Sequence, residues 1–236
     1  MNFKTFLIFA TILAAIGLPL ALYLAPEETI SSPLNKQLEK VKNSIQPLKA
    51  KKVSVEQILK TKRCRGCNLT EIDLSGLDLS GADFRNTDLS RANLTNTKFK
   101  DAKMSGARLN EANLKNADLD GVDLHDSELK NADLTEANLF NIRLDNADLS
   151  NATLHRVELR DADLIGATLK NADLSHASLY GTRLTEANLT GTNLSNTNMR
   201  YANLLNATLE GANLQGADLQ LAVMPDGTTV YGTTQY

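Results

Sequence analysis

The sequence predicts an all-β solenoid, a repetitive fold in which short extended segments stack into a β-helix. From about Cys67 to Asp226, a large apolar residue recurs at every fifth position without an insertion. A small residue, most often Ala, stands two positions before it. A period of five fits neither an amphipathic helix nor an alternating strand, and repetition at a fixed spacing is itself a sign of repeat architecture.

The chain opens with an apolar segment from Phe6 to Ala25. About 20 helical residues cross the ~30 Å hydrocarbon core of a bilayer, so we expect residues 1–26 to be a signal anchor and residues 6–25 to contact the membrane. A cleavable signal peptide is the open alternative. Cleavage after Ala25 would place Tyr23 at the −3 position and Pro26 directly after the cut, and neither suits a signal peptidase.

Residues 27–53 form a polar, basic linker. Residues 1–67 carry a net charge of +7 and the remainder −10, which together give the −3 of the whole chain. We expect the repeats to face away from the cytoplasm, in a periplasm or a thylakoid lumen, because positive residues flank the apolar segment on both sides and those beyond it are set back.

Residues 54–66 are expected to cap the first coil. Ser54 and Gln57 have the spacing of a capping box that begins a short helix. The apolar residues available to cover the end of the core are Val55, Ile58 and Leu59. Cys64 and Cys67 form a single CxxC, which cannot by itself make a four-thiolate zinc site. We predict a structural role in the cap for these cysteines, with a disulfide or a redox role as the alternative.

The repeat domain, residues 67–226, contains 32 pentads centred on positions 69, 74 and so on to 224. The central position holds Leu in 27 of them, and the position two before it holds Ala in 20. One coil cannot fold alone, because the burial of its few Leu side chains does not offset the entropy of ordering its backbone. Stacking is therefore required. The motif Pro225-Asp226-Gly227 ends the ladder, since Pro lacks an amide donor, and residues 227–236 are expected to be a tail.

These pentads resemble the pentapeptide-repeat family, as in Ala132-Asp133-Leu134-Thr135-Glu136. The entry from Thr61 to Cys67 and the exit from Met224 to Gly227 resemble those of cyanobacterial members that are membrane-anchored or exported. The resemblance implies a right-handed quadrilateral β-helix with four pentads per turn, hence about eight coils. It also implies a non-enzymatic role. Some members inhibit DNA gyrase by presenting an acidic rod shaped like a duplex, which makes DNA mimicry the alternative function.

With four pentads per turn, residues twenty apart stack on each other. One such column alternates in charge from Asp83 to Arg183 and is explained by stabilisation of the stack. His155 and His176 should approach each other, but two His without a third ligand make a weak metal site. We expect no cofactor, no metal and no catalytic residues, since no nucleophile, base or glycine loop stands out.

One column alternates aromatic residues with Arg, and its apolar neighbours have no core to enter. We expect this surface to bind a protein partner or to form a homodimer through the C-terminal half, whereas nucleic acid is not an expected partner. The candidate residues are Phe140, Arg160, Ile165, Tyr180, Arg200, Tyr201, Leu205 and Leu221. The sequence thus predicts a membrane-tethered structural or interaction scaffold.

Overall fold

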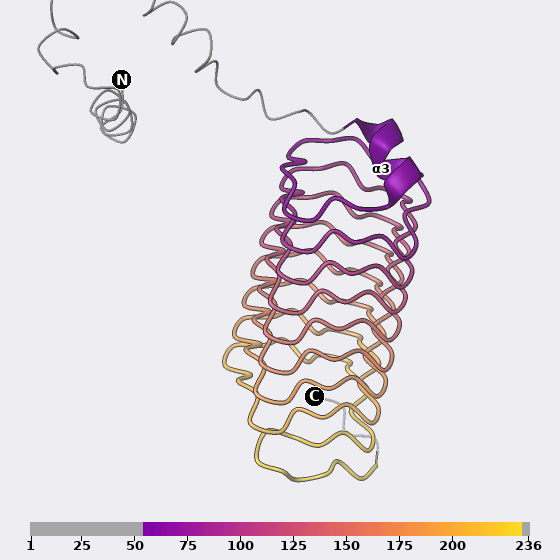
Figure 1. The fold of residues 1–236 in the computed structure, drawn as a ribbon. Helices are drawn as coiled ribbons and strands as arrows, with labels where there is room; N and C mark the ends of the chain where they lie inside the picture. Colours follow the sequence, from indigo (N-terminus) through magenta and orange to yellow (C-terminus); the bar gives the residue numbers. More distant parts are fainter. Residues whose placement is uncertain (1–53, 233–236) are drawn as a thin grey trace, which may run out of the picture. The chain divides into compact units, whose positions relative to one another are not determined.

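The repeats stack into a four-sided β-helix (Figure 1). The computed structural model describes residues 54–232, which lie in the second of two compact units, Val53–Tyr236. Each side of a coil contributes one residue to a parallel ladder, and every rung joins a residue to the one twenty positions later, from Arg63↔Asp83 to Asn203↔Val223. The predicted right-handed quadrilateral β-helix is confirmed, and its ladder already includes Arg63.

The core is a column of the central and small residues of the pentads. Leu134 and Ala132 are 0% and 1% exposed, and their counterparts in the middle coils are equally buried. The two aromatic central residues, Phe84 and Phe99, meet edge to face with ring centroids 6.1 Å apart. Large and small side chains therefore alternate around each coil and fill its narrow interior.

Each side of the coil ends in the same turn. The amide of Ala132 donates to the carbonyl of Leu129, and the residue before it, Asn131, has a φ of 56°. A left-handed third residue with this hydrogen bond defines a type II turn. The same left-handed corner recurs at every fifth residue from Gly66 to Leu221.

In a pentad with Asp before its central Leu, such as Ala132 to Glu136, all five amides find an acceptor. One amide donates to the carbonyl that closes the turn, and one donates to a carbonyl of the previous coil. Two amides donate to carbonyls of the next coil, and the last donates to a side chain of the same pentad. In the pentad from Ala132 to Glu136, the acceptors are, in order, the carbonyls of Leu129 (3.1 Å), Ala112 (3.0 Å) and Thr153 (2.8 Å), the Asp133 carboxylate (3.1 Å) and the carbonyl of His155 (3.0 Å). The side-chain acceptor is why Asp or Asn precedes the central Leu.

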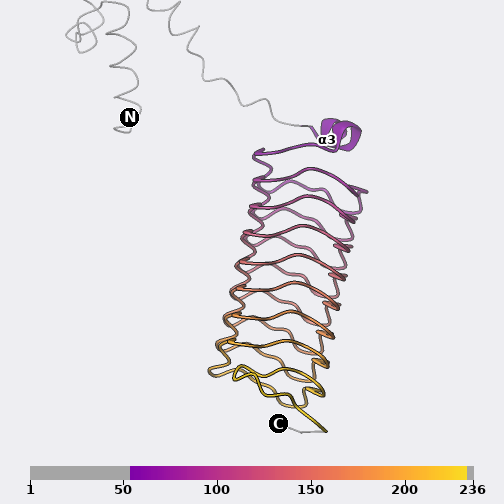
Figure 2. The ribbon, with the colours of Figure 1, turned by 60° about the horizontal axis from the view of Figure 1, so that its bottom comes forward.

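A short helix, α3 (Val55–Thr61), covers the first coil (Figures 1 and 2). Its N-cap, Ser54, accepts a hydrogen bond from the amide of Gln57 at 3.2 Å. Ile58 is fully buried and Val55 packs partly against the core. The expectation for Leu59 is wrong, because its side chain is 38% exposed. A helix of two turns presents only one narrow stripe of side chains to the core. Ile58 lies on that stripe, and Leu59, the next residue in sequence, lies outside it.

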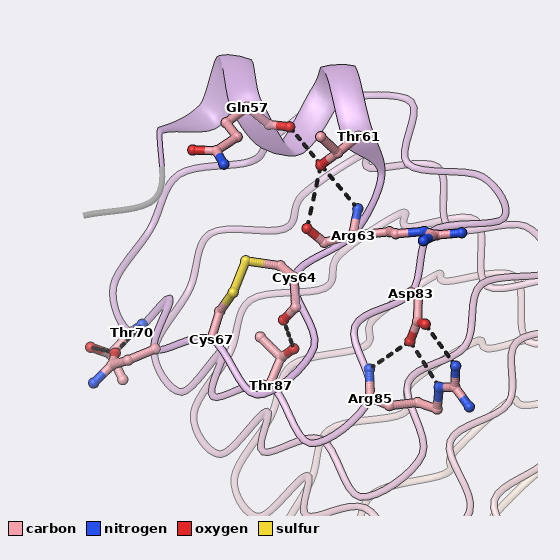
Figure 3. The surroundings of a disulfide bond; sticks show 10 residues. Gln57, Thr61, Arg63, Cys64, Cys67, Thr70, Asp83, Arg85 and Thr87 are labelled. Atoms are coloured by element: carbon pink, nitrogen blue, oxygen red, sulfur yellow. Dashed lines mark hydrogen bonds and ion pairs between the residues drawn. A yellow bond between two sulfur atoms is a disulfide. The ribbon is translucent and has the colours of Figure 1, made fainter. Parts of the chain in front are cut away.

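A disulfide between Cys64 and Cys67 closes the entry to the first coil (Figure 3). Cys64 is 3% exposed, and its carbonyl accepts a hydrogen bond from the hydroxyl of Thr87 in the next coil. The Cys64–Cys67 disulfide is the alternative that the CxxC spacing left open, and both cysteines lie within the cap. It joins the first and last residues of the first corner turn, whose hydrogen bond runs from the amide of Cys67 to the carbonyl of Cys64.

The other end of the rod is closed differently. After the Pro225-Asp226-Gly227 turn, the chain folds back and Thr229 pairs antiparallel with Val223. Val230 donates to the carbonyl of Ala222 at 3.0 Å and is 9% exposed. The first part of the expected tail thus lies against the last coil (Figure 2).

No helix within residues 54–232 is long and apolar enough to cross a membrane. The expected anchor at residues 6–25 and the linker lie outside the described residues.

Candidate interaction surface

The predicted aromatic column is present on one side of the rod. The rungs Asn138↔Glu158 and Glu158↔Ser178 place Phe140, Arg160 and Tyr180 in successive coils. Phe140 and Tyr180 are 36% and 37% exposed, whereas the central Leu residues of the same coils, such as Leu139 and Leu179, are fully buried. We call this surface the aromatic band; its members are Phe140, Arg160, Ile165, Tyr180, Arg200, Tyr201, Leu205 and Leu221.

Two aromatic contacts organise the aromatic band. The guanidinium of Arg160 lies 5.7 Å from the ring centroid of Phe140, a cation–π contact, and its Nε donates to Glu158 at 3.0 Å. The ring of Tyr180 lies 5.1 Å from that of Tyr201 at an interplanar angle of 60°. Within residues 54–232, the alternation of aromatic residues and Arg gives a cation–π contact only at its first step, because Tyr180 turns toward the corner instead of stacking between two Arg side chains.

The corner at Tyr201 and Leu221 departs from the rest of the molecule. These residues have φ values of 60° and 62°. The other corners of the ladder within residues 54–232 carry Gly, Asn, Asp, His or a charged residue. A left-handed conformation costs a residue with a Cβ about 1–2 kcal/mol, and only short polar side chains offset this locally. Bulky apolar residues at two stacked corners are not explained by the turn.

The remaining members complete a continuous surface. Leu205 is 37% exposed and Ile165 is half-buried, both on the side that follows the corner. Arg200 lies 3.8 Å from Asp218, so its charge is compensated within the chain. The amide of Leu221 donates to the carbonyl of Val230 at 2.8 Å, which ties this corner to the folded-back strand.

Tyr231 is a residue that sequence reasoning missed. It directly follows Val230 and is 80% exposed. Because residues 227–236 were expected to be a tail, no position on the surface could be assigned to it. Antiparallel pairing of its neighbour now places it beside the C-terminal end of the aromatic band.

Charges outside the aromatic band are largely paired between coils. Such pairs include Arg108–Asp88, Lys100–Asp120 and Arg183–Asp163, each at 2.7–2.8 Å. In the predicted alternating column, Arg143 is 3.6 Å from Asp123, and Asp83 bonds Arg65 and Arg85. Arg143 also lies 3.5 Å from Asp145, whose buried Oδ1 has no hydrogen-bond partner. This surface stabilises its own stack.

The two histidines do contact each other. The ring centroids of His155 and His176 are 5.4 Å apart, and Nδ1 of His155 lies 2.9 Å from the hydroxyl of Ser175. No group of three His, Cys, Asp or Glu residues suited to a metal occurs in the stretch 54–232. The pair is part of the surface of the stack.

Comparison with known proteins agrees with this architecture. The model of a family described as "Pentapeptide repeats" matches eight copies, in residues 63–101, 102–141, 132–171 and 187–224, together more than half of the chain. HetL, a pentapeptide repeat protein involved in heterocyst differentiation regulation from the cyanobacterium Nostoc sp. strain PCC 7120, is 30% identical, with 75% of this chain and 99% of HetL covered and a TM-score of 0.46.

A trypsin-treated form of QnrB1, a plasmid-mediated fluoroquinolone resistance protein, shares 21% identity with a TM-score of 0.66, over 72% of this chain and 87% of that one. At this identity the likeness establishes the fold alone. The search of curated proteins found no match to the chain.

Proposed function

Because the chain belongs to the pentapeptide-repeat family, whose members are generally structural or interaction proteins, we propose that it is a non-enzymatic scaffold that binds a protein through the aromatic band. The placement of Tyr201 and Leu221 at left-handed corners carries this proposal. The other left-handed corners of the described coils carry Gly or polar residues, so these two stacked corners differ from the rest in their apolar surface. Exposed apolar side chains that gather on one side of a soluble rod mark interaction surfaces.

The test replaces two band residues by charges. We expect Phe140→Glu with Tyr180→Glu to abolish partners that co-purify with the full-length chain from its host, since a buried unpaired carboxylate opposes binding. The matched control is Ser150→Glu with Thr190→Glu, at the same pentad position on another side of the rod. Circular dichroism should be unchanged in both. Equal partner recovery with the band and control variants would refute the proposed surface.

We also propose that residues 6–25 tether the scaffold to a membrane with the repeats outside the cytoplasm. Support comes from the length and apolarity of this segment. Protease added to intact cells or spheroplasts should digest the repeats, and the mature N-terminus should be Met1 or its neighbour. Full protection of the repeats would place them on the cytoplasmic side instead.

A DNA-mimicking topoisomerase inhibitor is the competing function, favoured by the fold shared with QnrB1. Mimicry of a duplex requires a continuous negative surface, whereas here Lys and Arg pair with many carboxylates between coils. A supercoiling assay decides between the two: we expect no inhibition of gyrase by micromolar protein, and inhibition in that range would favour mimicry.

A further inference from the structure

One column of the aromatic band alternates aromatic residues with Arg, so a second copy of the column in reverse order would place an Arg opposite each ring. At equal steps of twenty residues the column reads Phe140, Arg160, Tyr180, Arg200. Reversing this order places an Arg opposite every aromatic ring. A two-fold axis perpendicular to the rod performs that reversal, and two-fold interfaces require a surface that is complementary to itself.

We propose that the aromatic band joins two copies of this chain side by side and antiparallel, about a two-fold axis between the coils of Arg160 and Tyr180. The inference rests on the proposed function, since it names the partner of the same surface. Arg160 then faces Tyr180 of the second copy, and Phe140 faces Arg200. Each contact occurs twice, which gives four cation–π contacts across the interface.

Alignment in the same direction is disfavoured by the same column. An axis parallel to the rod would set Arg160 against Arg160 and Arg200 against Arg200 of the second copy. Directly opposed like charges are destabilising. Only the antiparallel arrangement uses the alternation.

The neighbouring columns fit the same axis. Each neighbouring column of one copy faces the same column of the other copy in reverse order, and no pair combines like charges. These pairs are Asn138 with Asn198 and Glu158 with Ser178 in the column before the central Leu, and Asn141 with Tyr201 and Asp161 with Gly181 at the corner. Beyond the aromatic residues, Asp120 faces Gln220, whose amide can donate to it.

Charge and exposure of the column support the contact. The side chains of Arg160 and Arg200 are 53% and 38% exposed, so each keeps solvent-exposed surface for a second copy in addition to its contacts within the chain. Glu158 and Asp218 already compensate these cations within one chain, so two copies approach without net repulsion.

The length of the linker is compatible with an antiparallel pair. Residues 27–53 can span at most roughly 90 Å when extended, more than the ~38 Å of eight stacked layers, so the proposed anchors of both copies can reach one membrane.

Sedimentation of the full-length chain in mild detergent tests the interface. The wild type should be a dimer at micromolar concentration. Tyr180→Arg opposes Arg160 of the second copy at two places and should weaken the dimer at least tenfold. Adding Arg160→Glu to the same chain replaces repulsion by attraction and should restore it. Thr190→Arg, at the same pentad position on another side, is the control that keeps the dimer.

Cross-linking tests the direction of the second copy. The two native cysteines are joined to each other, so introduced cysteines are the reactive ones. A mixture of Phe140→Cys and Arg200→Cys chains should cross-link through a short bismaleimide. Phe140→Cys alone should not, because its two sites are three layers apart, about 14 Å along the rod.

The outcomes separate this inference from the proposed function. A monomeric wild type at 100 μM, a dimer indifferent to Tyr180→Arg, or efficient cross-linking of Phe140→Cys alone would each overturn the antiparallel dimer. If in that case Phe140→Glu with Tyr180→Glu still abolishes co-purified partners, the aromatic band remains a binding surface for another protein.

Discussion

Where Asp or Asn precedes the central Leu, its side chain can accept the one amide of the pentad that no carbonyl reaches. Asp148 does so for the amide of Ser150 at 3.0 Å and also accepts the Ser150 hydroxyl at 2.6 Å. Burial raises the pKa of Asp148, but hydrogen bonds from Ser150 and Lys130 outweigh it and hold that pKa below its usual value. The preference for Asp or Asn at this position is therefore a backbone requirement.

Asp148→Ala removes this acceptor. We expect it to lower the free energy of unfolding by about 1–2 kcal/mol, because the amide of Ser150 loses its partner in a partly buried position. Asp148→Asn keeps an acceptor oxygen and should cost less. Thermal unfolding followed by circular dichroism compares the two, and equal losses would mean that the charge of Asp148, rather than its acceptor, is what matters.

Glycine at a corner has a second role where an Asn or Asp precedes it by one coil. A Cβ added at Gly166 would lie 2.7 Å from Oδ1 of Asn146, whereas one added at Gly81 would meet nothing within 4 Å. The two glycines have similar φ values, 66° and 68°. Their comparison separates backbone strain from steric contact.

Gly166→Ala should therefore be more destabilising than Gly81→Ala. Both pay the left-handed cost of about 1 kcal/mol, and only the first must displace the Asn146 side chain. The midpoint of thermal unfolding measures the difference. A Gly81→Ala variant as unstable as Gly166→Ala would show that the neighbouring side chain yields freely.

At the scale of elements, α3 shows how a repetitive stack is ended by a non-repetitive piece. Its contribution to the core is concentrated in Ile58, which is fully buried, while Leu59 is exposed. Capping pieces of this kind are required because an uncovered end leaves apolar side chains and strand edges open.

Ile58→Ala should lower stability by about 2–5 kcal/mol, the range for emptying a well-packed core site. Leu59→Ala should cost less, about 1 kcal/mol, since Leu59 lies outside the buried core cluster and its truncation leaves no closed cavity. Chemical denaturation of the two variants is the measurement. Comparable losses would contradict the assignment of Ile58 as the covering residue.

The ends of the rod were also the least predictable elements. Inward positions such as Ala147 could be assigned from the period alone, because stacking forces every coil to repeat the last. Leu59 could not, since a seven-residue helix offers no periodicity to average over. The CxxC spacing favoured a structural cap and left the disulfide as an alternative, because one Cys pair does not by itself specify its redox state. The antiparallel pairing of Thr229 lies outside the repeat and so outside its pattern.

The same distinction applies to the aromatic band. Its residues follow from steps of twenty along the sequence, but the turn of Tyr180 toward Tyr201 does not. At an exposed column, two neighbours compete for one side chain, and a difference of a few tenths of a kcal/mol in rotamer or contact energy decides. Register is predictable, whereas side-chain choice at the surface is not.

At the scale of the whole molecule, one buried column holds all coils together. Ala147 is 1% exposed in the middle of that column. Ala147→Arg should prevent folding or limit it to the coils on one side, because a bulky cation cannot enter the closed interior. Ser150→Arg, three residues later and pointing outward, should be tolerated. Circular dichroism and limited proteolysis report both, and equal tolerance would invert the assignment of inside and outside.

Several Asp carboxylates have pKa values below their usual value. The pKa is lowered for Asp73, Asp78, Asp83, Asp88, Asp123, Asp133, Asp148, Asp173 and Asp226. Folding thus favours their ionised form, and the resulting stability is fully present above the unfolded pKa of about 3.9 and is lost as the pH falls through the lowered folded values.

We therefore expect the midpoint of thermal unfolding to be flat between about pH 8 and pH 5 and to fall steeply below about pH 4. The sum over many carboxylates along the ladder should make acid unfolding cooperative along the rod. Unfolding temperatures that stay constant down to pH 2 would show that the carboxylates contribute equally when protonated.

Every rung of the ladder spans twenty residues, and this has a consequence for how the gene can change. An insertion or deletion of sixty nucleotides lengthens or shortens the rod by one layer and leaves all sides facing as before. One of fifteen nucleotides keeps the core intact but turns everything downstream by a quarter of a revolution. The length of the rod and the direction that its sides face therefore change in steps of different size. A change of either kind between Phe140 and Tyr201 disrupts the reversal symmetry of the column of aromatic and Arg residues.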